Sequence, residues 1–279
     1  MKLFKALLPL KNHLDKQNLN SLGLVPTMGA LHDGHLALVE RAVKENTYVV
    51  VSIFVNPTQF DDVKDLNAYP QTLKDDIEKL GLFGDKLFVY APEVSDLYPH
   101  KTQSESYEFG ALDKTMEGGS RKGHFQGVAT IVQKLLEGFM PTRAYFGEKD
   151  FQQLTIIQAL VEQKQLPIEI VNCPIVREKD GLAMSSRNRR LSPQHRKLAP
   201  KIYTALLEAK AQKESFAVEE INRWIENYFN QQPEFELDYF CVAETGSLKP
   251  LTGKVNAQEA RAFIAVKLGE VRLIDNINF

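Results

Sequence analysis

The 279-residue chain is predicted to be an α/β protein: a doubly wound parallel sheet followed by a smaller C-terminal α+β domain. Two observations predict this fold class. Apolar, β-branched runs alternate with segments of helical periodicity over the first two thirds, and the composition changes after about residue 176. Such alternation is typical of βαβ units, whose crossover helices make successive strands parallel. With 43% hydrophobic and 25% charged residues, the composition is that of a globular protein.

The first domain is expected to span residues 1–176 and to be Rossmann-like. Its first 16 residues are predicted to form an amphipathic strand and helix, because Lys5 interrupts the leucines and no small-residue cleavage site follows. The predicted strands are the apolar runs at 22–27, 47–55, 86–91, 143–147 and 167–176. The predicted helices, which have apolar residues at helical spacing, are 35–46, 72–81, 125–139 and 151–163.

The second domain is expected to span residues 177–279. Arginine, lysine and serine predominate in 177–197, which predicts a polar hinge. Two helical segments and three short strands follow, near 193–213, 216–231, 235–244, 262–268 and 271–274. This part is a natural candidate for a lid that moves about the 176–183 segment.

Charge and composition exclude several functional classes. The net charge is -2, so there is no global electrostatic basis for binding nucleic acid. No apolar run approaches the ~20 residues that cross a bilayer. Cys173 and Cys241 form neither a metal-binding spacing nor a disulfide framework. We therefore expect a cytoplasmic protein with no membrane or nucleic-acid partner.

The segment VPTMGALHDGHLALV (25–39) carries the clearest chemical signal. A buried strand ends at Thr27, Gly29 permits a tight turn, and a helix is expected to begin near Gly34. A helix N-terminus at the carboxyl edge of a parallel sheet favours a phosphate, through its free amides and its dipole. His32 and His35 are three residues apart and can lie on one side of the first turn. They could donate hydrogen bonds where charge develops at an α-phosphorus, although two capping histidines on a solvated turn are the structural alternative.

A second segment, MSSR (184–187), follows in the polar region. Two hydroxyls and a guanidinium on a mobile loop can follow a triphosphate as charge moves to the leaving pyrophosphate. Alone this motif is common in exposed loops. Together with the histidine motif it indicates an enzyme that breaks ATP between the α- and β-phosphates. The chain has no Walker sequence and no G-x-G-x-x-G, which disfavours γ-phosphoryl transfer and dinucleotide chemistry.

Seven motifs, in order, make the chain resemble the pantoate–β-alanine ligase family over nearly its whole length. They are PTMGALHDGH (26–35), SIFVNPTQF (52–60), YPQTLKDD (69–76), GHFQGVATIV (123–132), YFGEKDFQQL (145–154), VREKDGLAMSSRN (176–188) and RLIDNI (272–277). The resemblance implies ATP-dependent condensation of pantoate with β-alanine through a pantoyl adenylate, with release of AMP and pyrophosphate. Without the resemblance, the residues predict only chemistry at the α-phosphate of ATP.

The resemblance also implies roles for individual residues. His35 matches a proton-donating histidine that stabilises the transition state, His32 assists at the phosphates, and Lys149 neutralises phosphate charge. The implied ATP-binding residues are Met28, Gly29, Ala30, Leu31, His32, Asp33, Gly34, His35, Gly147, Glu148, Lys149, Asp150, Val176, Met184, Ser185, Ser186 and Arg187. Val176 matches a main-chain contact to adenine.

For pantoate, the resemblance implies Gln59 and Gln153 as ligands, with Asn56 shaping the same wall and Gln59 lying beside β-alanine. Paired amides suit pantoate because its hydroxyls and carboxylate need both donors and acceptors. Mg²⁺ is expected with ATP, and Asp75 and Asp76 are its candidate ligands. A solvated acidic helix face is the alternative for these two aspartates. A homodimer is also implied.

The sequence departs from the family at one position. The family often has Arg-Pro-Gly-His-Phe, whereas this chain has Lys122 between Arg121 and Gly123. Without the proline, the loop before helix 125–139 is expected to be looser.

Two alternative functions remain open from the sequence. A related nucleotidyltransferase, which joins a nucleotide to a phosphate substrate, shares the histidine motif. A nucleotide-binding regulatory protein on the same fold would catalyse nothing. The contexts of Gln59 and Gln153 disfavour the first, and the retained histidines and Lys149 disfavour the second.

Overall fold

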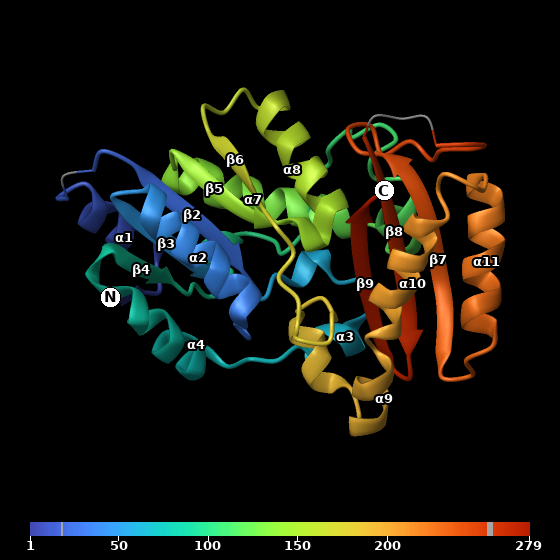
Figure 1. Ribbon diagram of the computed structural model, residues 1–279. Coiled ribbons are helices and arrows are strands. Elements are labelled where there is room, and N and C mark those ends of the chain that lie inside the picture. The colour runs from blue at the N-terminus through green and yellow to red at the C-terminus, as the bar shows by residue number, and fades with distance from the viewer. Residues whose placement is uncertain (18, 256–258) are drawn as a thin grey trace.

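The computed structural model describes residues 1–17, 19–255 and 259–279. Six parallel strands form one sheet in the order β1-β4-β3-β2-β5-β6, and three antiparallel strands form a second sheet in the order β7-β8-β9 (Figure 1). The parallel strands are β1 (Lys2–Phe4), β2 (Leu22–Thr27), β3 (Tyr48–Ile53), β4 (Leu87–Tyr90), β5 (Arg143–Gly147) and β6 (Glu169–Cys173). The predicted fold class is confirmed.

Strand order reverses beside β2, the most interior of the apolar runs. From β2 the chain adds β3 and then β4 on one side, and it later adds β5 and β6 on the other. The connections that follow β2 and β5 therefore leave the sheet in opposite directions. A crevice at such a reversal is where open α/β sheets bind ligands.

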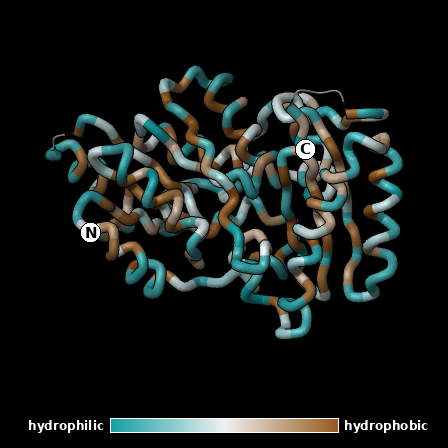
Figure 2. Tube along the Cα trace, viewed as in Figure 1, coloured by the Kyte–Doolittle hydropathy of each residue, from teal (hydrophilic) through white to brown (hydrophobic). Residues whose placement is uncertain are grey.

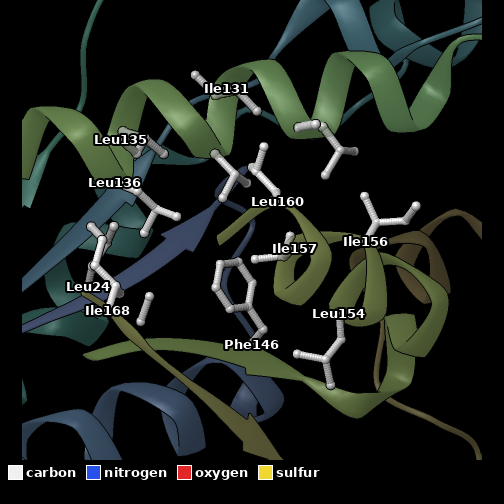
Figure 3. Close-up of a cluster of buried hydrophobic side chains, with 14 of the residues drawn as sticks. Leu24, Ile131, Leu135, Leu136, Phe146, Leu154, Ile156, Ile157, Leu160 and Ile168 are labelled. Atoms are coloured by element: carbon white, nitrogen blue, oxygen red, sulfur yellow. The ribbon is translucent and has the colours of Figure 1, made fainter. Parts of the chain in front are cut away.

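Helices cover both faces of the parallel sheet. The helices and 3₁₀ turns of this part are α1 (Leu7–Leu14), α2 (Asp33–Glu45), η1 (Pro57–Gln59), α3 (Val63–Asn67), α4 (Leu73–Leu80), η2 (Gly81–Lys86), α5 (Val94–Leu97), α6 (Met116–Ser120), α7 (His124–Phe139), η3 (Glu148–Asp150) and α8 (Phe151–Gln163). Apolar residues of α1, α7 and α8 form a core on one face, and those of α2 and α4 form a core on the other. Figure 3 shows the α7 and α8 side chains converging on Leu24 and Phe146 of the sheet.

The C-terminal part packs helices on the antiparallel sheet. Its elements are η4 (Ser186–Arg190), α9 (Pro193–Leu198), α10 (Lys201–Ala211), α11 (Val218–Asn230), β7 (Phe235–Glu244), β8 (Ala260–Leu268) and β9 (Val271–Asn278). Buried residues of α10 and α11 pack against this sheet, and α11 alternates hydrophobic and hydrophilic residues along its length (Figure 2). Among the described helices, none has the length and apolar character that a membrane crossing requires.

Three expectations for this part need correction. The predicted helix 193–213 is two helices, because Pro200 has no N–H to continue the hydrogen-bond ladder. The predicted strand 262–268 begins two residues earlier, at Ala260, and the predicted strand 271–274 continues to Asn278. The second half of this strand contains the polar residues Asp275, Asn276 and Asn278, the first two of them buried, so a search for apolar runs does not find it.

The two parts share a core, so residues 1–176 and 177–279 are not packed separately. Phe263 and Ala243 of the antiparallel sheet belong to the same apolar cluster as α7 and α8, and the rings of Phe151 and Phe263 lie 6.0 Å apart. The division of the chain at residue 176 remains a prediction.

A buried ionic network also joins the two parts. The guanidinium of Arg272 in β9 donates two hydrogen bonds of 2.8 Å to the carboxylate of Glu117 in α6, which is 7% exposed. The hydroxyl of Tyr239 donates to the same carboxylate at 2.8 Å, and Asp238 also pairs with Arg272 at 2.6 Å. Burial disfavours the charged carboxylate, but Arg272 more than offsets this and lowers the pKa of Glu117.

We predict that Glu117→Gln destabilises the protein far more than Glu236→Gln. The first change removes the carboxylate of Glu117 and leaves Asp238 as the acidic partner of Arg272. Breaking a buried ion pair in this way destabilises a protein by about 3 kcal/mol. The second removes an exposed pair, Glu236 with Lys267, which contributes less than about 1 kcal/mol. The free energy of unfolding in urea measures both. Equal losses would contradict a structural role for the buried network.

Candidate active site

A cavity of about 220 Å³ opens at the carboxyl edge of the parallel sheet. Its walls come from the segments that follow β2, β3, β5 and β6, and from the loop before η4. A wider, charged cavity of about 760 Å³ adjoins it between the two sheets and shares Lys149, Asp150 and Gln153 with it. The cavity lies at the carboxyl edge of the parallel sheet, the place that the sequence predicts for the site, and beside the reversal of strand order.

Most of the predicted site residues line this smaller cavity. Those that do are Met28, His32, Gly34, His35, Asn56, Gln59, Gly147, Lys149, Asp150, Gln153, Val176, Met184, Ser185, Ser186 and Arg187. Those that lie outside its lining are Gly29, Ala30, Leu31, Asp33, Glu148, Asp75 and Asp76. Ala30 and Leu31, in the turn between β2 and α2, are fully buried. Asp33 is exposed at the start of α2.

The turn after β2 is held by one buried carboxylate. Gly29 and Ala30 both have positive φ, 78° and 49°, so the chain turns sharply and directs successive amides the same way. The carboxylate of Asp76 in α4 accepts from the amides of Ala30 at 3.0 Å and Leu31 at 2.7 Å. The hydroxyl of Thr72 donates to it as well, at 3.2 Å. This turn therefore has a fixed shape before any ligand binds.

This geometry does not support the prediction that Asp75 and Asp76 ligate magnesium. Both oxygens of Asp76 already accept hydrogen bonds and its side chain is fully buried, whereas Asp75 is exposed. In the parts of the chain that the structure describes, no group of three or more His, Cys, Asp or Glu side chains could hold a metal ion. The sequence does not distinguish these two adjacent aspartates. Their different exposure on α4 does, because Asp75 faces outward and Asp76 faces the protein interior.

His32 and His35 lie together at the start of α2. Their ring centroids are 4.0 Å apart, and both rings line the cavity. The amide of His32 donates to Nδ1 of His35 at 3.4 Å. Because Nδ1 accepts, a neutral His35 ring carries its proton on Nε2 and can donate it to an anionic ligand.

Both rings are neutral at neutral pH. Burial lowers the pKa of His35 to about 4, helped by Lys149 and Lys79 and opposed by Asp150. Burial, His35 and nearby cations lower the pKa of His32 to about 2. The ammonium of Lys79, which the sequence analysis missed, donates to the carbonyl of Leu31 at 2.6 Å. A polyanion would reverse these effects, because its charge favours the protonated rings.

The turn that carries Lys149 is fixed from the second sheet. The side-chain amide of Asn276 in β9 donates to the carbonyls of Glu148 and Lys149, both at 2.9 Å. The Glu148 carboxylate pairs with the buried Arg261 at 3.4 Å. Glu148 is therefore a structural anchor, while Lys149, paired with the half-exposed Asp150 at 3.4 Å, faces the cavity.

The Ser-Ser-Arg segment lines the cavity next to the turn after β2. The hydroxyl of Ser186 donates to the carbonyl of Ala30 at 3.0 Å, which ties this segment to the turn after β2. The guanidiniums of Arg187 and Arg190 pair with Asp65 of α3 at 2.8 and 2.6 Å. Burial opposes ionisation of Asp65, but the two arginines more than offset it and lower its pKa. The carboxylate of Asp65 therefore pairs with two guanidiniums of this segment.

The segment that the sequence predicts as a hinge forms a small hairpin. The amide of Met184 donates to the carbonyl of Val176 at 3.0 Å, and Arg177 pairs with Ala183 as an isolated bridge. Arg177 also makes hydrogen bonds of 2.6 and 3.0 Å to the buried Asp275 of β9. Motion about residues 176–183 remains a prediction, and it would carry this hairpin as a unit with β9.

Two neighbouring glutamines have different roles. Gln153 lines the cavity, whereas Gln152 is buried and bonds to main-chain groups of Leu112, Thr115 and Glu117. Across the cavity, Gln59 in η1 is 8% exposed. All four hydrogen-bonding positions of the Asn56 amide are filled by protein groups, so Asn56 supports the wall rather than offering a free group.

Hydrogen bonds hold the loop that lacks the family's proline. Nδ1 of His124 donates to the carbonyl of Gln59 at 2.8 Å, and Arg121 lies 3.3 Å from the other ring nitrogen. Burial and Arg121 lower the pKa of His124 to about 4. Lys122 is exposed, and Gly123 has a φ of 78° just before α7. Side-chain contacts thus connect this loop to η1, and its looseness remains a prediction.

The sequence profile described as pantoate-beta-alanine ligase matches residues 2–278. The chain belongs to this family. Its similarity to individual family members is high over the whole length, so the expected family resemblance is confirmed.

Curated relatives include the pantothenate synthetase of Flavobacterium psychrophilum, 47% identical over 94% of this chain and 93% of the relative. Another, from Phocaeicola vulgatus, is 47% identical over 100% and 99% of the two chains. Among solved structures, pantothenate synthetase from Thermus thermophilus superposes with a TM-score of 0.91 at 43% identity, covering 99% of both chains.

A further solved structure is pantoate-beta-alanine ligase from Francisella tularensis, described as complexed with beta-gamma ATP and beta-alanine. It has a TM-score of 0.83 at 34% identity, over 100% of this chain and 97% of that one.

We predict that Asp76→Asn destabilises the protein by about 1–3 kcal/mol, because an amide cannot accept from both Ala30 and Leu31 with two oxygens. Asp75→Asn, at the exposed neighbouring position, should change the free energy of unfolding by less than about 0.5 kcal/mol. Urea unfolding measures both. A larger magnesium requirement in Asp75→Asn, with stability unchanged, would instead favour a metal-binding role for that carboxylate.

We also predict a pH effect from the half-buried histidines. Between the unfolded pKa of about 6.5 and the folded value of about 4, the unfolded chain binds more protons at His35, so stability falls as pH falls. His35→Gln should make this slope shallower by up to about 1.4 kcal/mol per pH unit. Urea unfolding between pH 4.5 and 6.5 measures the slope, and equal slopes would contradict a neutral, half-buried His35.

Proposed function

We propose that this chain condenses pantoate with β-alanine in an ATP-dependent reaction that yields pantothenate, AMP and pyrophosphate. One observation supports this beyond family membership. A single cavity combines the neutral pair His32 and His35 with the amide side chains of Gln59 and Gln153. The first pair suits a phosphate ester, and the second suits a small hydroxy acid.

ATP is proposed to lie along the carboxyl edge of the sheet. Gly34 has no side chain where the ligand would approach α2, and its added Cβ would lie 2.9 Å from the His32 ring. The main chain of Val176 would contact adenine, since Val176 and Met184 form one wall of the cavity. Lys149 and the Ser185–Arg187 segment would meet the phosphates, with Arg187 exchanging Asp65 for phosphate oxygens.

Pantoate is proposed to lie between Gln59 and Gln153. Its carboxylate would attack the α-phosphorus, forming the acyl–phosphate bond of pantoyl adenylate while pyrophosphate leaves. The Nε2–H of His35 would donate to the α-phosphate as charge increases there, which is electrostatic stabilisation by a donor already in place. The amine of β-alanine, beside Gln59, would then attack the acyl carbon, and AMP would leave.

Adenylation solves a chemical problem that the amide product imposes. A free carboxylate has no viable leaving group, whereas AMP leaves readily from the acyl adenylate. The adenylate would hydrolyse in water, so the site must be covered while it persists. The hairpin at 176–184 and the segment around Asp65 are the proposed cover, because both already contact the Ser-Ser-Arg segment.

Magnesium enters this proposal only with the triphosphate. The described residues provide no metal cage, and Mg²⁺ commonly retains water and binds mainly substrate phosphates. A homodimer and a cytoplasmic location are proposed from the family resemblance alone.

The test is pyrophosphate release from ATP and magnesium, with pantoate alone and then with β-alanine. We expect one enzyme equivalent of bound adenylate without β-alanine, and turnover to pantothenate after its addition. His35→Ala should slow adenylate formation by at least about a hundredfold, because it removes a transition-state donor. Activity with a phosphate substrate, and none with pantoate, would instead identify a nucleotidyltransferase.

Unchanged pyrophosphate release by His35→Ala would show that His35 does not act on the phosphates. Circular dichroism and ATP binding of the variant confirm that it is folded. Binding of ATP without any turnover, whatever acid is supplied, would favour a regulatory protein.

A further inference from the structure

Gln59 presents a buried donor that lacks a good acceptor. Its Oε1 accepts from Nδ2 of Asn56 at 3.2 Å, so its amide nitrogen points the other way. Among the residues that the structure describes, the nitrogen there donates only to the thioether of Met28, at 3.1 Å. A thioether is a weak acceptor, and a buried N–H without a strong partner is costly. A ligand carboxylate or hydroxyl oxygen at this position would satisfy it.

The orientation of Gln59 is set by Asn56. A main-chain carbonyl can only accept, so the carbonyl of Gly127, 3.1 Å from Asn56, must face the amide nitrogen of that side chain. The remaining proton of this nitrogen goes to Oε1 of Gln59. Asn56 is 1% exposed and cannot turn over without breaking these bonds.

Tyr98 provides the strongest contact to Asn56 from behind the wall. Its hydroxyl donates to Oδ1 of Asn56 at 2.7 Å, the shortest of the four bonds that Asn56 makes. Thr58 donates to the same oxygen at 3.1 Å. Tyr98 is 6% exposed and lines neither described cavity, so it can act on a ligand only through Asn56 and Gln59.

We propose that Tyr98 is a positioning residue, which through Asn56 holds the Gln59 amide with its N–H toward the acid substrate. The inference rests on the proposed function and extends it to specificity. A substrate must present an acceptor oxygen to Gln59, and a donor at that position is rejected. Loosening Asn56 lets the Gln59 amide turn over and offer its oxygen, which repels a carboxylate.

The test compares Tyr98→Phe with Tyr107→Phe. Tyr107 is a buried tyrosine in the same stretch of chain, and its hydroxyl bonds to Gln133 at 2.9 Å without contacting Asn56. We expect Tyr98→Phe to raise the KM for pantoate by about five- to tenfold, the effect of one hydrogen bond. The KM for ATP should change by less than about twofold, and Tyr107→Phe should leave both unchanged.

A double-mutant cycle separates positioning from general loosening. In a Gln59→Leu background there is no amide to orient, so adding Tyr98→Phe should change kcat/KM for pantoate by less than about twofold. If the effects of Gln59→Leu and Tyr98→Phe on kcat/KM for pantoate multiply in the double mutant, the inference is overturned. Equal shifts of the KM for pantoate and the KM for ATP in Tyr98→Phe would also overturn it, and so would a similar rise of the KM for pantoate in Tyr107→Phe. Absence of pantothenate formation by the parent protein would instead refute the proposed function.

Discussion

The candidate site depends on buried hydrogen bonds from one strand, β9, to three separate segments of the chain. Arg272 holds Glu117 at the base of the α6–α7 wall, and Asp275 holds Arg177 in the 176–184 hairpin. Asn276 holds the turn that carries Lys149. The parallel sheet alone places strand ends along one edge, but it does not fix the loops beyond them. The polar side chains of Arg272, Asp275 and Asn276 fix those loops, which explains why half of the residues in the RLIDNI motif are polar.

The electrostatics of the site are arranged before a ligand arrives. Lys79, Lys149 and Arg189 surround two imidazoles whose pKa they and burial depress, so the site is neutral at the rings and positive around them. Asp65 meanwhile balances Arg187 and Arg190. In the proposed binding mode, a triphosphate replaces one carboxylate by several phosphate oxygens, and cations that are already in place lose little solvation on binding. The same arrangement disfavours protonation of the two histidine rings.

Much of this arrangement could be predicted from sequence, and the rest fails for identifiable reasons. Buried parallel strands are continuous apolar runs, so 22–27 and 143–147 are predicted to the residue. The distinction between Asp75 and Asp76 depends on which one faces the turn after β2, a contact across 45 residues. Tyr98 acts on Asn56 from 42 residues away, and no local pattern marks such a partner. Local spacing therefore predicts strand ends and phosphate loops but not the side chains that brace them.

The anchoring of Lys149 by Asn276 has a consequence for biosynthesis on the ribosome. The two residues are 127 positions apart, so the parallel sheet can emerge and pair well before the strand that fixes the turn of Lys149 has been translated. A nascent chain at that stage would have the strands of the parallel sheet, but the turn of Lys149 would not yet be held by Asn276. The apolar surface that later packs against Phe263 would be exposed. Capacity to bind ATP tightly would thus arise late, as a property of the finished polypeptide rather than of its first folded part.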